Sequence, residues 1–140
     1  MRSFNVPTCL AALLLVGWAA PVPAQADSPR AALETYLAGL KTGNVGLVLS
    51  VYHFGDRRPD YYLPGPIPIE SHRITKELVF DTIQARRHNT HGVIPPAQAG
   101  DVELQVEERI SGHGEMYTYW LRLIDGHWRI YAHTAWNAPD

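Results

Sequence analysis

Cysteine is nearly absent from this chain of 140 residues, which has a single thiol at Cys9. One cysteine cannot form a disulfide within the chain or supply a metal site made of several thiolates. Positive charge is not in excess either. The 12 Lys and Arg residues are outnumbered by 14 Asp and Glu residues, and the net charge is −2. A nucleic-acid partner is therefore not expected, because it would require a basic surface.

The first 26 residues have the pattern of a secretion signal. Arg2 gives a positive start, an apolar run extends from Cys9 to Ala20, and the small residues Ala24 and Ala26 precede the expected cleavage site. Cleavage is expected after Ala26, with cleavage after Ala24 as the second choice. The apolar run is shorter than the roughly 20 residues of a spanning helix, so we expect no membrane insertion after cleavage.

Residues 27–140 then form one domain, expected in the periplasm or secreted. This length supports one hydrophobic core and is too short for two. Because Cys9 leaves with the signal, the core has to stabilise the exported domain without disulfides, and a cysteine nucleophile is excluded.

The start of this domain predicts a helical hairpin. Ser28 is a suitable N-cap, Pro29 suits the first helical turn, and Gly43 suits the position after the last turn. Asn44 can cap a second helix that extends to about Phe54. The apolar stripe of the first helix consists of Leu33, Tyr36, Leu37 and Leu40.

The middle of the chain is harder to interpret. Residues 55–70 contain four prolines and two glycines and predict a turn-rich crossing. Residues 72–84 suit a strand or a helix face, and we favour a strand because β-branched and aromatic residues dominate their centre. Residues 85–100 are polar and then proline-rich, which predicts a long excursion before the sheet resumes.

The last third predicts a three-stranded antiparallel meander. A strand over residues 102–110 alternates apolar and polar residues, and two-residue turns are expected at His113–Gly114 and Asp125–Gly126. These turns would place Glu108 opposite Tyr119 and Tyr119 opposite Ala132. The inner face would then hold Tyr117, Tyr119, Leu121, Leu123, Trp128, Ile130, Thr134 and Trp136.

The outer face of this meander is mixed. Trp120 and Tyr131 form an aromatic patch, which predicts a subunit contact and a possible homodimer; the alternative is a pair of rings that cover one another. Arg122 and Arg129 are expected directly opposite each other beside this patch and belong to the same candidate interface. His133 is expected to point outward.

Glu108 is a carboxylate on the otherwise apolar face of its strand. A buried carboxylate needs hydrogen bonds and resists ionisation. One interpretation is a ligand anchor or general base near Tyr117 and Tyr119, and the alternative is a position near the strand end in solvent. The candidate ligand-binding residues are Glu108, Tyr117, Tyr119, Tyr52, His53 and Thr134.

Two stretches resemble the nuclear transport factor 2-like (cystatin-like) superfamily. "SPRAALETYLAGLKTGNVGLVLSVYH" is similar to its opening helical hairpin, and "YTYWLRLIDGHWRIYAHTAW" is similar to its closing β-hairpin. The resemblance implies an α+β fold in which the helical hairpin packs on a curved antiparallel sheet of about four strands, cone-like and with a cavity. It does not imply one activity, because the superfamily contains both enzymes and binding proteins.

The enzyme patterns of the superfamily do not transfer residue by residue. Glu108 with Tyr119 or Tyr117 imitates the isomerase pattern but lacks a second inward carboxylate. Arg122 and Arg129 face outward, which does not suit the epoxide hydrolase pattern, and His53 has no evident acidic partner for the dehydratase pattern.

Histidine spacing gives no metal prediction. His88 and His91 lie in a polar loop beside two arginines that would repel a cation, and a closed zinc site needs further ligands. No cofactor-binding fingerprint is present. We therefore expect non-catalytic binding of a small molecule or protein partner through the cavity or the outer sheet face. The alternative is a lyase- or isomerase-type enzyme that uses Glu108 and a cavity tyrosine.

Overall fold

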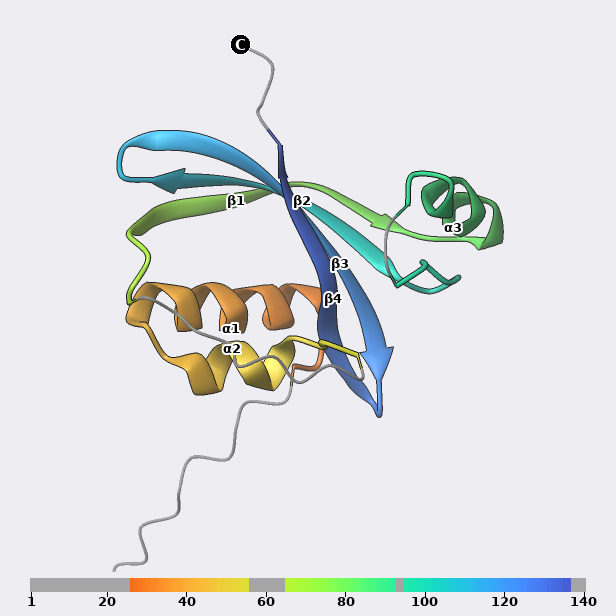
Figure 1. Ribbon diagram of the computed structural model, residues 1–140, viewed down its shortest axis with the longest axis horizontal. Helices are drawn as coiled ribbons and strands as arrows, with labels where there is room; N and C mark the ends of the chain where they lie inside the picture. The colour runs from red at the N-terminus through yellow and green to blue at the C-terminus, as the bar shows by residue number, and fades with distance from the viewer. Residues whose placement is uncertain (1–25, 56–64, 93–94, 137–140) are drawn as a thin grey trace, which may run out of the picture.

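The computed structural model describes residues 26–55, 65–92 and 95–136. It confirms an α+β fold, in which a helical hairpin precedes a curved, open, antiparallel sheet with the strand order β1-β2-β3-β4. The elements are α1 (Pro29–Thr42), α2 (Val45–Val51), β1 (Ile69–Val79), α3 (Thr82–Asn89), β2 (Val102–Ile110), β3 (His113–Ile124) and β4 (His127–Trp136). Helices α1 and α2 lie on one side of the strands β3 and β4, and α3 lies on the other (Figure 1).

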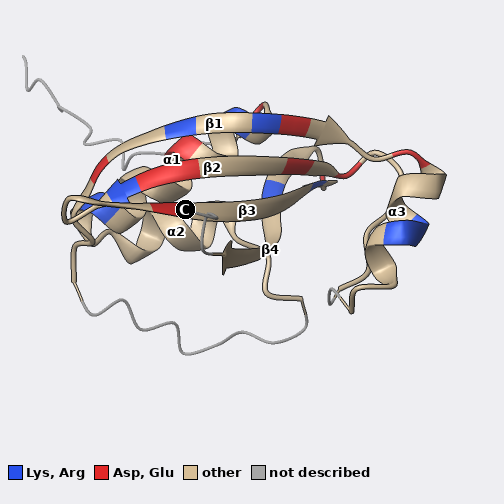
Figure 2. Ribbon diagram, turned by 90° about the horizontal axis from the view of Figure 1, so that it is seen from above, with Lys and Arg blue, Asp and Glu red and all other residues tan. Residues whose placement is uncertain are grey.

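Seen from above, α1 and α2 lie beneath the sheet, and residues of both charge signs occur along β1 and β2 (Figure 2). The main core lies between these helices and the concave face of the sheet. It includes Leu33, Leu37, Val48, Leu104, Val106, Leu121 and Ile130. Within the part of the chain that the structure describes, no helix is both long and apolar enough to cross a bilayer.

The predicted helical hairpin is confirmed. The Ser28 side chain accepts a hydrogen bond from the backbone N–H of Ala31 at 3.1 Å, and Gly43 ends α1 in the left-handed region at φ 69°. Gly39 allows α2 to approach closely, since a Cβ there would lie 2.8 Å from Val48 Cγ2. The chain immediately before α1 is also part of the fold.

Ala26 is buried, and its carbonyl accepts a hydrogen bond from the backbone N–H of Trp128 at 3.1 Å. Cleavage after Ala24 would retain this contact, whereas cleavage after Ala26 would remove it. The apolar run of the expected signal and most of the 55–70 crossing lie outside the described residues.

The ambiguous segment 72–84 contains both kinds of structure. It belongs to β1 up to Val79, as favoured, but α3 begins at Thr82 and continues into the predicted excursion. The change is set by a capping box, in which the Asp81 side chain accepts from the Gln84 N–H at 2.7 Å and the Gln84 side chain accepts from the Asp81 N–H at 2.9 Å.

The first β-hairpin turn differs from the prediction. Ser111 and Gly112 form it, with φ 50° and 80°, in place of His113–Gly114. Positive φ at both positions is the requirement of a type I′ turn, which matches the twist of the strands. Glu108 is therefore opposite Glu115. The displacement of the turn by two residues leaves Glu108 on the same face as predicted.

The second turn is at Asp125–Gly126 as predicted, and Leu121 lies opposite Ile130. Beyond that pair a β-bulge changes the register, so that Tyr119 lies opposite His133 and not Ala132. The predicted directions of the β4 side chains after the bulge are therefore wrong. His133 faces the helices, and Thr134 pairs with Thr118 on the outer face.

Trp136 is corrected in the same way, because its Nε1 donates to Thr118 Oγ1 at 3.1 Å. The outer face also differs from the prediction of an exposed aromatic patch. Trp120 and Tyr131 are 8% and 4% exposed, because residues from α3 and its flanking segments cover them. This second cluster contains Phe80, Ala85, Ala97, Trp120 and Tyr131. A homodimer through the outer face stays a prediction. Trp120 and Tyr131 do not support it, because both rings are already covered within the chain.

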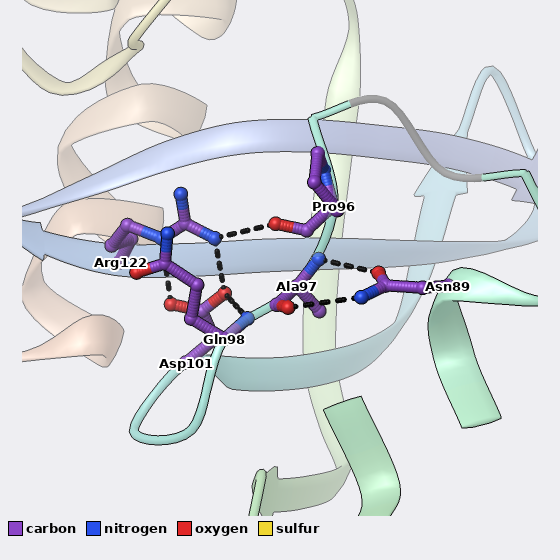
Figure 3. Close-up of polar contacts among 6 residues, drawn as sticks. All are labelled: Asn89, Pro96, Ala97, Gln98, Asp101 and Arg122. Carbon is purple, nitrogen blue, oxygen red and sulfur yellow. Dashed lines mark hydrogen bonds and ion pairs between the residues drawn. The ribbon is translucent and has the colours of Figure 1, made fainter. Parts of the chain in front are cut away.

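A largely buried ion pair between Arg122 and Asp101 fixes the segment before β2 to the outer face (Figure 3). Arg122 donates from Nε to Asp101 Oδ1 at 2.8 Å, from Nη2 to Asp101 Oδ2 at 2.7 Å, and from Nη2 to the Pro96 carbonyl at 2.8 Å. Its guanidinium also lies 4.6 Å from the centre of the Tyr131 ring. Arg129 is opposite Arg122 as predicted, but its Nη1 donates to the Ser50 carbonyl at 3.1 Å.

Removal of the Arg122 side chain should therefore be costly. We expect Arg122→Ala to lower the free energy of unfolding by about 3–5 kcal/mol, because Asp101 would stay buried without its counter-charge. Arg73→Ala is the control. Its ion pair with Glu107 is exposed, so we expect a loss of about 0–1 kcal/mol. Urea unfolding of both variants measures the difference, and equal losses would contradict this role of Arg122.

Candidate functional site

A pocket of about 270 Å³ lies between α1, the segment that enters β1, and the concave face of the sheet. Aromatic and aliphatic side chains form most of its wall, with one carboxylate and one imidazole. The lining residues are Tyr36, Leu40, Ile67, Ile69, Glu108, Ile110, Tyr117, Tyr119 and His133. The pocket is therefore mainly apolar, with a few polar groups that converge on it, which is the usual composition of a small-molecule site.

Glu108 is the buried carboxylate of this pocket, with 2% of its surface exposed. Its Oε1 accepts a hydrogen bond from the Tyr119 hydroxyl at 2.6 Å. Burial raises the pKa of Glu108, although the hydrogen bond from Tyr119 partly opposes that effect. The alternative of a carboxylate in bulk solvent is wrong. The role of Glu108 in ligand binding stays a prediction.

The tyrosines of the pocket are held against one another. The rings of Tyr117 and Tyr119 stack at 6.1 Å between centroids, and Tyr36 meets Tyr119 edge-on at 5.8 Å. The Tyr117 hydroxyl donates to Glu115 at 2.5 Å. Burial and the neighbouring carboxylates raise the pKa of both Tyr117 and Tyr119, so both hydroxyls stay protonated and act as donors.

His133 is a polar pocket residue that the sequence placed on the wrong face. Its ring stacks on Tyr119 at 5.7 Å, and its Nδ1 lies 2.9 Å from the Tyr52 hydroxyl. His133 as a whole residue is exposed to solvent. The surrounding rings nevertheless desolvate its imidazole, and this desolvation lowers the pKa of His133. The bulge near Trp120 and Tyr131 turns His133 inward. Neither position holds a glycine or proline, so the sequence does not indicate the bulge.

Three of the six predicted ligand-binding residues line the pocket, namely Glu108, Tyr117 and Tyr119. Tyr52 does not line the pocket but contacts two residues that do, His133 through its hydroxyl and Tyr36 through its ring. His53 and Thr134 are not among the lining residues. The backbone N–H of His53 donates to the Ile130 carbonyl at 2.7 Å, and Thr134 is exposed on the outer side of the sheet.

The other lining residues give different signals in the sequence. Tyr36 and Leu40 belong to the helical stripe, which predicted core positions but not a pocket. Ile67 and Ile69 follow the proline-rich crossing, whose path the sequence does not indicate. Ile110 is at the end of a recognisable strand, where the alternation alone places it on the inner face.

A second pocket, of about 310 Å³, borders Glu108 from the β1 side. His72 lies opposite Glu108 in the register of β1 and β2, and its Nε2 is 2.8 Å from Glu34 Oε1. This second pocket is lined by Ser71, His72, Arg73, Glu107, Glu108, Arg109 and Gly114. Among residues 26–55, 65–92 and 95–136, no group of three or more His, Cys, Asp and Glu side chains is arranged to hold a metal ion.

The raised pKa of Glu108 predicts a stability cost at neutral pH. The folded state holds the proton more tightly than the unfolded state, so stability falls as pH rises from the ordinary glutamate range through the raised pKa. A difference of one in pKa corresponds to about 1.4 kcal/mol. Glu108→Gln keeps an acceptor for Tyr119 and removes this cost. We expect the variant to be more stable than the wild type at pH 7 and to lose its advantage near pH 4.

Urea unfolding between pH 4 and pH 8 measures this effect. Glu107→Gln is the matched control, because Glu107 is adjacent in sequence but has an exposed side chain paired with Arg73. We expect that change to destabilise the domain by less than about 1 kcal/mol. A Glu108→Gln variant that is less stable than the wild type throughout this pH range would contradict the cost assigned to the carboxylate.

Comparison of the chain with protein-family models, with curated proteins and with solved structures returns no match. The function of the pocket therefore has to be inferred from its own geometry.

Proposed function

We propose that this domain binds a small molecule, without catalysis, in the pocket between α1 and the concave face of the sheet. The observation that carries the proposal is Glu108, a carboxylate 2% exposed in a mainly apolar pocket, whose Oε1 accepts from Tyr119. Burial of a charged group is unfavourable unless it is paired and hydrogen-bonded. A ligand that interacts with Glu108 would offset this cost.

The geometry favours this pocket over the outer sheet face as the binding site. The aromatic residues of the outer face are covered by the second hydrophobic cluster of the chain itself. The concave pocket is lined by side chains from α1, β1, β2, β3 and β4, and its aromatic rings contact one another. Its volume of about 270 Å³ is at the lower end of the usual range for ligand pockets, which favours a small ligand.

Export and membership of the nuclear transport factor 2-like superfamily belong to the same proposal. Export is supported by the sequence of the first 26 residues. Membership is supported by the two stretches that resemble the superfamily and by the helical hairpin that precedes a curved antiparallel sheet. A binding domain outside the cytoplasm is consistent with both.

Binding in this pocket should be sensitive to its volume. Three small aromatic probes, benzylamine, benzyl alcohol and benzoate, can be titrated into the domain and followed by NMR. We expect at least one of them to shift the ring signals of Tyr36, Tyr117 and Tyr119. Ile110→Trp places a larger side chain in the pocket and should weaken that binding at least tenfold. The matched control is Leu123→Trp, because Leu123 is 55% exposed and lies outside the pocket. Equal binding by both variants would contradict the proposed site.

A lyase- or isomerase-type enzyme is the second candidate function. The observation in its favour is that Glu108 and His133 both contact Tyr119, one through its hydroxyl and the other by stacking on its ring. The pKa of Glu108 is raised towards the pH at which a general base is most efficient, while the lowered pKa of His133 keeps its imidazole neutral. Glu108 would remove a proton from a carbon next to a carbonyl group.

Deuterium exchange distinguishes this candidate from binding alone. An enzyme of this type should incorporate deuterium from D₂O into the carbon next to the carbonyl of 2-indanone faster than buffer does, as measured by proton NMR. The Glu108→Gln variant should exchange deuterium at least 100-fold more slowly, because a general base typically contributes a factor of about 10²–10⁴ to the rate. No acceleration by the wild type, together with binding of 2-indanone in the pocket, would favour the non-catalytic function.

A further inference from the structure

We propose that the pocket accepts an organic ammonium ion, with its nitrogen beside Glu108 and its hydrocarbon part against the apolar wall. This inference rests on the proposed binding function and specifies the chemical class of the ligand. Three features of the pocket support it, namely its charge, its aromatic residues and its acceptor geometry.

The ionised form of Glu108 has no counter-ion in the pocket. Its lining residues include Glu108 but no lysine or arginine. Among the described residues, no side chain forms an ion pair with Glu108; Lys41 and His72 act on it only at longer range, and His72 contacts Glu34. Glu115, directly opposite Glu108 in the register, adds further negative charge. An anionic ligand would be repelled, whereas a cation would supply the missing charge.

The aromatic residues suit a cation with a hydrocarbon part. Tyr36, Tyr117 and Tyr119 line the pocket together, with ring centroids 5.8–6.1 Å apart where they contact. An ammonium group near a tyrosine ring is attracted by the ring's π electrons, and this attraction increases when water is excluded. Leu40, Ile67, Ile69 and Ile110 provide the apolar contacts that the rest of the ligand requires.

The hydrogen-bonding groups also favour a donor ligand. A carboxylate only accepts hydrogen bonds, and Glu108 Oε1 already accepts from Tyr119. An ammonium N–H can donate to the carboxylate at about 2.7–2.9 Å, as in other charge-assisted hydrogen bonds. His133 does not compete for the carboxylate as a cation, because its lowered pKa leaves it neutral at pH 7.

Three probes of similar shape and different charge test the inference at pH 7. Benzylamine is a cation, benzyl alcohol is neutral and benzoate is an anion. NMR titration of the full domain should give a dissociation constant for benzylamine at least tenfold lower than that for benzyl alcohol, and benzoate should bind most weakly. Shifts in the ring signals of Tyr36, Tyr117 and Tyr119 identify binding in this pocket.

Two variants identify the contribution of the carboxylate. Glu108→Gln should weaken benzylamine binding at least tenfold and change benzyl alcohol binding less than about twofold, because it removes charge with little change in shape. Glu107→Gln, which removes the adjacent carboxylate, should change neither. A cooperative urea transition establishes that each variant is folded before it is titrated.

The outcomes separate this inference from the proposed function. Benzyl alcohol or benzoate binding in the pocket as tightly as benzylamine, or benzylamine binding that is insensitive to Glu108→Gln, would overturn the ammonium assignment and leave small-molecule binding supported. No pocket shifts with any of the three probes would overturn the ammonium assignment and count against the proposed function as well.

Discussion

One extra residue in β4 determines what the closing hairpin contributes to each side of the sheet. The bulge pairs Trp120 with Ala132 and Leu121 with Ile130, so Tyr131 has no partner of its own on β3. Tyr131 then packs in the outer cluster, and the strand continues with His133 facing the helices. Without the bulge, His133 would be on the outer face, and Tyr119 would lose the imidazole stacked on it in the pocket.

The outer cluster stabilises the sheet from the side opposite the pocket. Hydrophobic residues of α3 and the segments around it pack on Trp120 and Tyr131 of the sheet, and Arg122 holds the chain between Pro96 and Asp101. Asn89 and Ala97 exchange two hydrogen bonds, at 2.6 and 3.1 Å, which connect α3 to the same segment (Figure 3). These contacts let the concave side contain polar groups, because the sheet does not depend on that side alone for its packing.

The sequence predicts the features that depend on local rules. Ser28 and Gly43 define the first helix, Asp125 and Gly126 define the second turn, and alternation places Glu108 inside. The bulge, the covering of Trp120 and the position of Ile67 depend instead on contacts between distant segments. Residues 80–101 alternate too little for their position to be predicted from the sequence, and Ile67, Ile69 and His133 reach the pocket wall through such contacts.

Two buried carboxylates of this domain have different surroundings. Asp101 and Glu108 are each 2% exposed. Asp101 receives a bidentate contact from Arg122 and the backbone N–H of Gln98, so the fold satisfies its charge fully. Glu108 receives a tyrosine hydroxyl and borders two pockets. A carboxylate retained only for stability would be expected to resemble Asp101, because an unpaired buried charge is unfavourable. The contrast supports the proposal that Glu108 interacts with a bound small molecule.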